Sequence, residues 1–394
     1  MEQPTTPRPG KLASGYRAFA LLATNTLLFF VIANILASIG LRVCSDEDDE
    51  IGVLSHGMDK LRAAYPGFSA RDIGQLLRET WTRHYIYEPF TQFREPEFDG
   101  QYVDIHARGF RHSSAQHPWP PARDKRTIFV FGGSTTFGFG VANDKAIPAA
   151  LESELRKGPC GDRIAVYNFG RSNYYTTQER ILFHDLVAGG HSPAMAIFVD
   201  GFNDVHFVDG EPKFTQTLAK YMEESDGELI LRAIKRLALA RLAKRIVGVP
   251  EPREDSVDDN TVMAQTRRVV GRWQANKRLI EATAKAHDVA VLFVWQPVPL
   301  YNYNLRFHSF YREGAYFVAR PRLLTTVYEL MAAQRWLYGD EMLWLGDLQA
   351  GRNQSLYVDR VHYTAAFNRD IARAIAPRVE AALCTPGSRP EPPT

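Results

Sequence analysis

Four short stretches of the sequence carry groups that could act together on a carbonyl carbon. Ser134 follows two glycines at the end of an apolar run, and Asp359 stands three residues before His362. Acyl transfer needs a nucleophile, a base that takes its proton, and a group that orients the base. These three side chains are of the right types for those roles.

The other two stretches offer hydrogen-bond donors for a developing oxyanion. Gly170 and Asn203 each follow an apolar run. We expect the backbone N–H groups of Ser134 and Gly170 and the side-chain amide of Asn203 to form an oxyanion hole. A helix capped by Thr364 would place its positive end near His362, which favours the neutral imidazole that can act as a base.

The stretch TIFVFGGSTTFGFG, residues 127–140, excludes three common glycine-rich motifs. A phosphate-binding P-loop requires a lysine where Phe139 stands, and a dinucleotide-binding loop requires a third glycine where Asn143 stands. The nucleophile elbow requires a glycine where Thr136 stands. A serine nucleophile of another type remains. The alternative is a loop rich in Ser and Thr that only caps the next helix.

Alternating strands and helices must position these groups. The run 127–131 is apolar without polar alternation, which is typical of a strand buried on both faces of a parallel sheet. Strands and helices that alternate at this spacing predict a parallel sheet with helices on both faces, and open sheets of this kind bind ligands at the carboxyl ends of their strands. The predicted strands are 127–131, 164–170, 195–203 with its closing turn, 289–295 and 342–345, and the predicted helices are 147–155, 177–186, 261–287, 312–336 and 364–382.

The amino-terminal region predicts a membrane anchor. Residues 18–41 form a run of 24 without a charge, and a helix of that length rises about 36 Å, enough to cross a hydrocarbon core of about 30 Å. Cations precede the run and the acidic stretch 46–50 follows it. This asymmetry predicts a single pass through the inner (cytoplasmic) membrane, with the amino terminus in the cytoplasm and the remainder extracytoplasmic.

Two alternatives to the anchor stay open. A cleaved signal peptide normally has an apolar region of about 7–15 residues, shorter than this one. A lipoprotein signal is less favoured because Arg42 and Val43, rather than small residues, precede Cys44.

The expected organisation follows from these patterns. The predicted parts are a cytoplasmic tail (1–17), a transmembrane helix (18–43), an extracytoplasmic lead-in (44–125), an α/β domain (126–384) with a helical insertion at about 205–260, and a disordered tail (385–394). In the lead-in, Ser69 is expected to cap a helix over 70–81. The segment 230–245 carries six cations. It is either a membrane-surface helix or an ordinary surface helix with solvated cations.

Charge and cysteine content limit the partners and cofactors. A formal net charge of +2 gives no global electrostatic case for nucleic acid. Three cysteines show no metal-ligand spacing, but Cys160 and Cys384 could form a disulfide outside the cytoplasm. Asp200 and Asp204 flank Asn203, and we interpret them as loop-capping residues rather than a carboxylate pair.

The four stretches, in this order, resemble the sequence blocks of the SGNH hydrolases, a superfamily of esterases and acylhydrolases also called GDSL. The resemblance covers roughly residues 125–382 and matches Gly132-Gly-Ser-Thr135, Asn168-Phe-Gly170, Gly201-Phe-Asn-Asp204 and Asp359-Arg-Val-His362 to those blocks. It implies a three-layer, flavodoxin-like fold with a five-stranded parallel sheet. The chain departs from the family in two ways: Gly133 stands where the family usually has an aspartate, and the segment between Asn203 and the next strand is long for the small lipolytic members.

By this resemblance, Ser134 is the nucleophile, His362 and Asp359 complete the triad, and Gly170 and Asn203 donate to the oxyanion. We therefore expect a membrane-anchored extracytoplasmic serine esterase that acts on an O-acyl or O-acetyl ester of a lipid or an envelope glycan, with no metal or organic cofactor. The alternatives are an O-acyltransferase that uses the same triad, and a non-catalytic envelope assembly subunit that keeps the fold.

Overall fold

The structure is a computed structural model that describes residues 11–44, 57–122, 124–223, 237–240, 242, 258–311, 318 and 320–384. Residues 51–217 and 254–394 form one compact unit, and residues 1–50 with 218–253 form another. The start of the predicted cytoplasmic tail, most of the cationic segment 230–245 and the predicted disordered tail lie outside the described residues.

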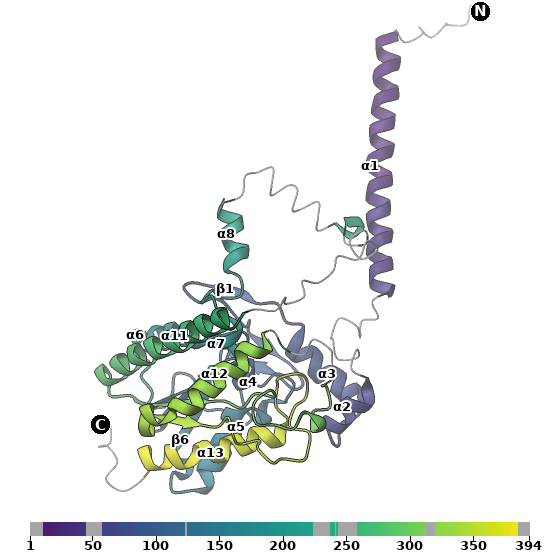
Figure 1. The fold of residues 1–394 in the computed structure, drawn as a ribbon. Coiled ribbons are helices and arrows are strands. Elements are labelled where there is room, and N and C mark those ends of the chain that lie inside the picture. The colour runs from purple at the N-terminus through teal and green to yellow at the C-terminus, as the bar shows by residue number, and fades with distance from the viewer. Residues whose placement is uncertain are drawn as a thin grey trace, which may run out of the picture. The chain divides into compact units, whose positions relative to one another are not determined.

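A five-stranded parallel sheet forms the centre of the larger unit (Figure 1). Every neighbouring pair of its strands is parallel. In spatial order the strands are β6 (Ile164–Asn168), β5 (Arg126–Gly132), β7 (Met195–Asp200), β8 (Ala290–Trp295) and β9 (Met342–Trp344). Numbered along the chain, this order is 2-1-3-4-5, as in flavodoxin-like sheets. The predicted fold class is therefore confirmed.

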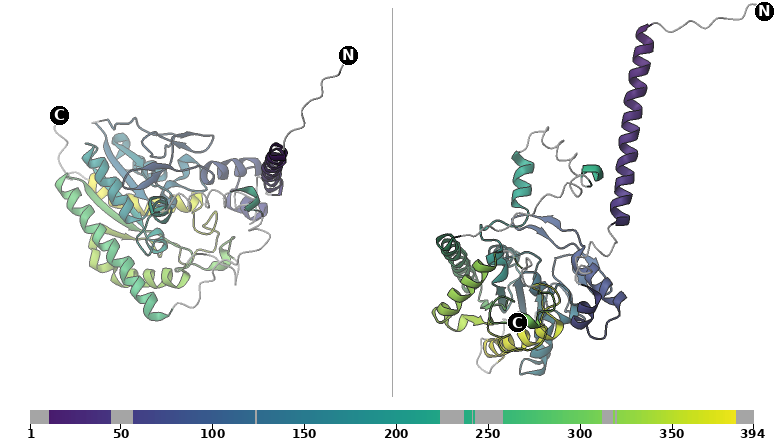
Figure 2. Two further views of the ribbon diagram at one scale, coloured as in Figure 1. Left: turned by 90° about the horizontal axis from the view of Figure 1, so that it is seen from above. Right: turned by 45° about the vertical axis from the view of Figure 1, so that its right-hand side comes forward.

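Helices cover both faces of this sheet. One face packs against α6 (Thr176–Ala188), α11 (Asp259–Ala286) and α12 (Pro321–Gln334), and the other packs against α5 (Ile147–Lys157) and α13 (Ala365–Leu383). Figure 2 shows α11 and α12 side by side in both of its views. Because both faces are covered, the central strands are apolar throughout rather than alternating.

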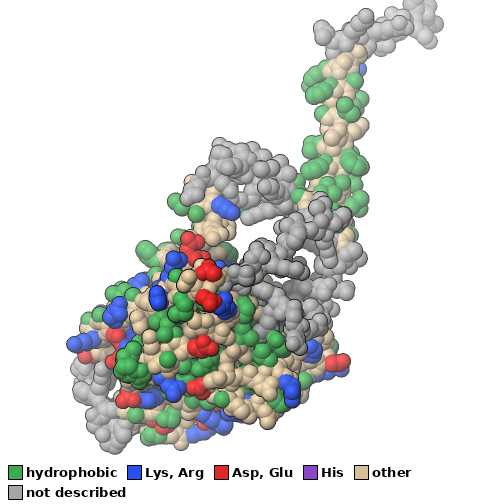
Figure 3. Space-filling model, in the orientation of Figure 1, with side chains coloured by type: hydrophobic (Ala, Val, Ile, Leu, Met, Phe, Trp, Pro, Cys, Tyr) green, Lys and Arg blue, Asp and Glu red, His purple; other side chains and the backbone are tan. Residues whose placement is uncertain are grey.

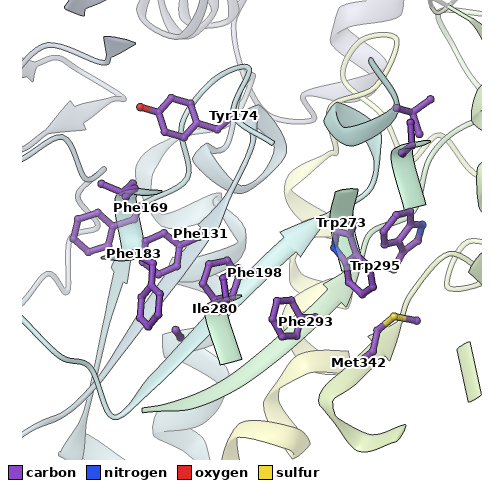
Figure 4. Packing of buried hydrophobic residues seen from close by; sticks show 14 of the residues in the cluster. Phe131, Phe169, Tyr174, Phe183, Phe198, Trp273, Ile280, Phe293, Trp295 and Met342 are labelled. Atoms are coloured by element: carbon purple, nitrogen blue, oxygen red, sulfur yellow. The ribbon is translucent and has the colours of Figure 1, made fainter. Parts of the chain in front are cut away.

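Aromatic side chains link the three central strands on the face that packs against α11 (Figure 4). Phe131 of β5 stacks on Phe198 of β7 with ring centroids 4.9 Å apart, and Phe198 stacks on Phe293 of β8 at 5.4 Å. The same residues are direct partners in the strand register. A shift of the register by one residue would move these rings to the opposite face of the sheet. Burial of the stacked rings on this face therefore stabilises the observed register. The carboxyl ends of the three strands consequently meet at one edge.

The lead-in packs into the same unit as the sheet. It contains α2 (Met58–Ala64), α3 (Ala70–Trp81), the hairpin of β1 (Ile86–Glu88) and β2 (Gln92–Arg94), and the paired strands β3 (Phe98–Asp99) and β4 (Asp104–Ile105). Ser69 caps α3, as predicted: its hydroxyl accepts from the backbone N–H of Asp72 at 3.2 Å.

Some element boundaries differ from the prediction. The strand expected over 164–170 ends at Asn168, and the helix expected over 312–336 begins at Pro321. Proline suits the first turn of a helix because a backbone N–H at that position would have no acceptor within the helix.

The shorter elements are α4 (Ser134–Phe137), α7 (Phe202–His206) and α8 (Thr215–Glu223), with 3-10 turns at Asn143–Lys145, Gly161–Arg163, Leu305–Phe307 and Arg335–Glu341.

The smaller unit is built on α1 (Lys11–Cys44). Its stretch Ser14–Gly40, 27 residues, is long and apolar enough to cross a membrane. Figure 3 shows hydrophobic side chains along this helix. The side chain of Asn34 accepts a hydrogen bond at 3.3 Å from the backbone N–H of Leu239, which belongs to the insertion.

Cys160 and Cys384 form a disulfide in the larger unit. Cys160 lies just after α5, and Cys384 is the residue that follows α13. These two helices pack against each other on one face of the sheet. The bond therefore joins the ends of neighbouring helices that are 224 residues apart in sequence.

Replacing both Cys160 and Cys384 with serine should lower the free energy of unfolding by about 2–5 kcal/mol, because the crosslink that restricts the unfolded chain is lost. Urea unfolding of the full-length protein in detergent, followed by tryptophan fluorescence, measures the change. Cys44→Ser is the matched control and should leave the midpoint unchanged. Equal midpoints for all three proteins would contradict a stabilising role for the bond.

Candidate active site

Ser134 lies at the carboxyl edge of the sheet, where the chain leaves β5. That strand ends at Gly132, Gly133 continues the turn, and Ser134 begins the short helix α4. Gly132 has φ of +154°, and a Cβ there would clash with the hydroxyl of Thr136. Only glycine fits such a turn without strain. The turn leaves Ser134 partly exposed, whereas the next three residues are buried.

His362 connects Ser134 to Asp359. Its Nε2 lies 2.8 Å from Oγ of Ser134, and its Nδ1 lies 2.5 Å from Oδ2 of Asp359. These distances allow hydrogen bonds on both sides of the ring. The structure thus brings together three side chains from the first and last stretches, with Ser134 and His362 separated by 228 residues in sequence.

A tight loop before α13 holds Asp359 and His362. The backbone N–H of Val358 donates to the carbonyl oxygen of His362 at 2.8 Å, which closes the loop. Oδ1 of Asp359 accepts from the backbone N–H groups of Val361 and His362, both at 2.8 Å. The helix begins directly afterwards, with Thr364 as its predicted N-cap. The imidazole therefore lies close to the positive end of a 19-residue helix.

Asp359 stays ionised despite its burial. Burial acts to raise the pKa of this carboxyl, but the interaction with His362 and hydrogen bonds from two backbone N–H groups act against it, and the resulting pKa lies below the ordinary value. On the other side of Asp359, burial raises the pKa of Tyr65, and the carboxylate raises it further, so the phenol is neutral. The ring of Phe139 stacks on His362 with centroids 5.2 Å apart.

Asn203 lies against the turn that carries Ser134. Its Nδ2 donates to the carbonyl oxygen of Tyr174 at 2.6 Å. An amide nitrogen has two hydrogens, so one remains for another acceptor. A Cβ on Gly133 would clash with Nδ2 of Asn203. The absence of a side chain at position 133 is therefore what lets the amide approach this turn.

Gly170 differs from the expectation. Its backbone N–H donates to Oδ1 of Asn168 at 3.0 Å, so this group is already engaged within its own loop. A Cβ at this position would clash with the backbone of Thr136 and Phe137 in α4. Gly170 is thus adjacent to the nucleophile-bearing helix, and its lack of a side chain allows that packing.

Asp204 caps loops, as predicted: its carboxylate accepts from the backbone N–H groups of Gly201 and Thr176. Asp200 and Asp204 are both buried, together with Glu179 of α6. Asp200 accepts from the indole N–H of Trp273 at 2.8 Å, and Asp204 accepts from the hydroxyl of Thr176 at 2.5 Å. Burial, with the neighbouring Asp204, raises the pKa of Asp200 to about 7. Burial and then Asp200 also raise the pKa of Glu179.

Arg111 is a site residue that the sequence did not indicate. It is buried, and it donates to the carbonyl oxygens of Phe137 (2.9 Å), Gly138 (2.6 Å) and Val141 (2.6 Å). These carbonyls belong to the chain that follows Ser134, so the lead-in stabilises the end of α4. No motif surrounds Arg111, and only the structure shows where its guanidinium lies.

No group of three or more His, Cys, Asp or Glu residues in the described ranges could hold a metal ion. The chemistry available at this edge of the sheet is that of a hydroxyl, an imidazole, a carboxylate and an amide.

No protein-family model and no curated protein sequence matches the chain. Solved structures that are similar to it include a GDSL-like lipase from Bacteroides thetaiotaomicron (13% identity, 67% of this chain and 92% of that one, TM-score 0.35). TesA is also similar, with 15% identity over 65% of this chain and 99% of that one, and a TM-score of 0.35. So is LAE5, an alpha/beta hydrolase enzyme from the metagenome of Lake Arreo, with 16% identity over 64% of this chain and 94% of that one, and a TM-score of 0.32. These TM-scores lie below 0.5, so the activity has to be inferred from the residues of this chain.

Gly133→Ala should lower the free energy of unfolding by about 1–3 kcal/mol, because the new methyl group must displace the amide of Asn203 from the turn. Thermal unfolding measures the change. Gly271→Ala in α11 is the matched control: nothing lies within 4 Å of its added Cβ, and alanine is the better helix former. Equal or higher stability of Gly133→Ala would show that the amide does not need the space.

Proposed function

We propose that the protein is a serine esterase, or acylhydrolase, in which Ser134, His362 and Asp359 form the catalytic triad. The proposal is carried by one observation. His362 lies between the other two, with Nε2 2.8 Å from the hydroxyl of Ser134 and Nδ1 2.5 Å from the carboxylate of Asp359. This is the geometry in which an imidazole can take the serine proton while the carboxylate stabilises the imidazolium.

In the first half of the reaction, Oγ of Ser134 attacks the ester carbonyl carbon as its proton moves to Nε2 of His362. The tetrahedral intermediate carries its negative charge on the former carbonyl oxygen. The imidazolium then gives the proton to the leaving alkoxy oxygen as the ester C–O bond breaks. The products of this half are an alcohol and an acyl group attached to Ser134.

Water completes the reaction. His362 takes a proton from a water molecule, whose oxygen attacks the acyl carbon. The second tetrahedral intermediate collapses when the imidazolium returns a proton to Oγ, which releases a carboxylic acid and restores Ser134. The ionised state of Asp359 suits both halves, because each forms an imidazolium next to it.

Two donors are well placed for the oxyanion. Ser134 is the first residue of α4, so its N–H has no acceptor within the helix. The second N–H of the Asn203 amide lies against the same turn. The third predicted donor, Gly170, would have to share its N–H with Oδ1 of Asn168. We therefore assign the main oxyanion contacts to Ser134 and Asn203.

The substrate we propose is an O-acyl or O-acetyl ester of a lipid or an acylated glycan. Phe139, Phe202 and Val361 each lie beside one of the reacting groups in sequence or space, and each is only partly buried. Such side chains can contact the apolar part of an ester. These residues limit the substrate class without selecting an acyl chain length.

We also propose that α1 is a signal anchor and that the catalytic domain is extracytoplasmic, at the inner (cytoplasmic) membrane. The apolar stretch of 27 residues is longer than the apolar region of a signal peptide. The charge asymmetry around it favours a cytoplasmic amino terminus. A disulfide between Cys160 and Cys384 suits an oxidising compartment.

Ser134→Ala should lower kcat/KM for a short-chain aryl ester by at least about 10³-fold and abolish covalent labelling by a fluorophosphonate, because it removes the hydroxyl next to His362. Ester hydrolysis and gel fluorescence of the full-length protein in detergent measure both effects. Ser153→Ala, at an exposed position of α5, is the control and should behave as the wild type.

Persistent labelling of Ser134→Ala would assign the nucleophile to another residue. A wild-type protein that is neither labelled nor active on any ester would favour the non-catalytic assembly subunit instead. Acyl transfer to an added sugar at the expense of hydrolysis would identify a transferase.

A further inference from the structure

Gln296 contacts both of the loops that carry the proposed triad. It follows the last residue of β8 directly and is only 4% exposed. Its backbone N–H donates to the carbonyl oxygen of Asp200 at 3.0 Å, and its own carbonyl oxygen accepts from the hydroxyl of Tyr328 at 2.9 Å. The backbone of Gln296 is therefore held from both sides.

The side chain of Gln296 joins the two loops that carry the nucleophile and the base. Its Oε1 accepts from the hydroxyl of Thr135 at 2.7 Å and lies 3.2 Å from the hydroxyl of Tyr363. The closer acceptor for the single proton of Tyr363 is the carbonyl oxygen of Pro297, the residue after Gln296, at 2.6 Å. Thr135 is the residue after Ser134, and Tyr363 is the residue after His362. A single oxygen atom thus contacts the immediate neighbours of both reacting residues.

The loop of Asn203 belongs to the same network. Asp200, the backbone partner of Gln296, is the last residue of β7 and precedes Gly201. A Cβ on Gly201 would lie 2.5 Å from the hydroxyl of Tyr328, the same hydroxyl that donates to Gln296. The start of the Asn203 loop therefore packs against a partner of Gln296.

We propose that Gln296 is a positioning residue that sets the relative placement of Ser134, His362 and Asn203. The inference rests on the proposed function. Its physical reason is that the three groups come from separate loops, and a misplacement of about 1 Å in such a site can cost about 10²-fold in rate. One buried acceptor that contacts two of the loops restricts their relative motion directly.

A buried glutamine can also be merely structural, and the chain contains a suitable comparison. Gln178 of α6 is fully buried, and its Nε2 donates to the carbonyl oxygen of Thr91 at 2.7 Å. That contact joins α6 to the loop between β1 and β2 and involves neither Thr135 nor Tyr363. Loss of either side-chain amide should destabilise the protein, but only loss of the Gln296 amide should change the relative positions of Ser134 and His362.

The first test replaces each glutamine with methionine, which has a similar length but no strong hydrogen-bond acceptor. In the full-length protein, Gln296→Met should lower kcat by about 10–100-fold with KM changed by less than about 3-fold. Gln178→Met should lower the unfolding temperature and keep kcat within about 2-fold of the wild type. A Gln296→Met protein with wild-type kcat would overturn the proposal.

The second test asks whether Thr135 acts through Gln296. Thr135→Val should lower kcat in the wild-type background. In the Gln296→Met background its further effect should shrink to less than about 2-fold, because its acceptor is already gone. Full additivity of the two substitutions would show that the hydroxyl of Thr135 does not act through this side chain.

A readout that needs no turnover separates failure of this proposal from failure of the proposed function. Nitrogen-15 NMR of the His362 imidazole reports the hydrogen bonds of Nδ1 and Nε2. Gln296→Met should shift the Nε2 signal, and Gln178→Met should leave it unchanged. An inactive, unlabelled wild type with a shifted Nε2 signal in Gln296→Met would refute the enzyme alone, whereas an unshifted signal would refute the positioning role.

Discussion

Burial of both faces of the central strands is the constraint on which the site depends. The stacked rings of Phe131, Phe198 and Phe293 lie in one register across β5, β7 and β8. Parallel strands in a common register end at the same edge, and each of these strands is followed there by a polar residue of the network: Ser134 after β5, Asn203 after β7 and Gln296 after β8. The apolar core and the polar edge are thus two results of the same packing.

Each loop at the carboxyl edge of the sheet is held in place by different contacts. Glycine at position 133 leaves room for the amide of Asn203, and glycine at 170 leaves room for the helix that starts at Ser134. The loop of His362 is held by its own backbone hydrogen bonds and by Oδ1 of Asp359. Because each loop is supported separately, their mutual placement needs a link, and the side chain of Gln296 is suited to that role.

Much of this arrangement could be predicted from the sequence. Uninterrupted apolar runs indicated the strands, and the order of Ser134, Asn203, Asp359 and His362 indicated which groups would meet. Backbone details could not be predicted. The N–H of Gly170 donates to the side chain of Asn168, and this contact depends on the conformation of that side chain. Burial of Asp200 and Asp204 depends on where α6 and Trp273 pack, and the role of Arg111 depends on a guanidinium that reaches a distant loop. Such contacts join positions that no local pattern relates.

The central claim is that Ser134 attacks a carbonyl carbon with His362 as its base. The most direct measurement is to mix the protein with an aryl acetate, quench with acid within milliseconds to seconds, and locate the added acetyl group by mass spectrometry of the digested protein. We predict an acetyl group on the peptide that contains Ser134, formed in the wild type and absent from His362→Ala. An acetyl group on another residue, or equal acetylation of Ser134 without His362, would contradict the account.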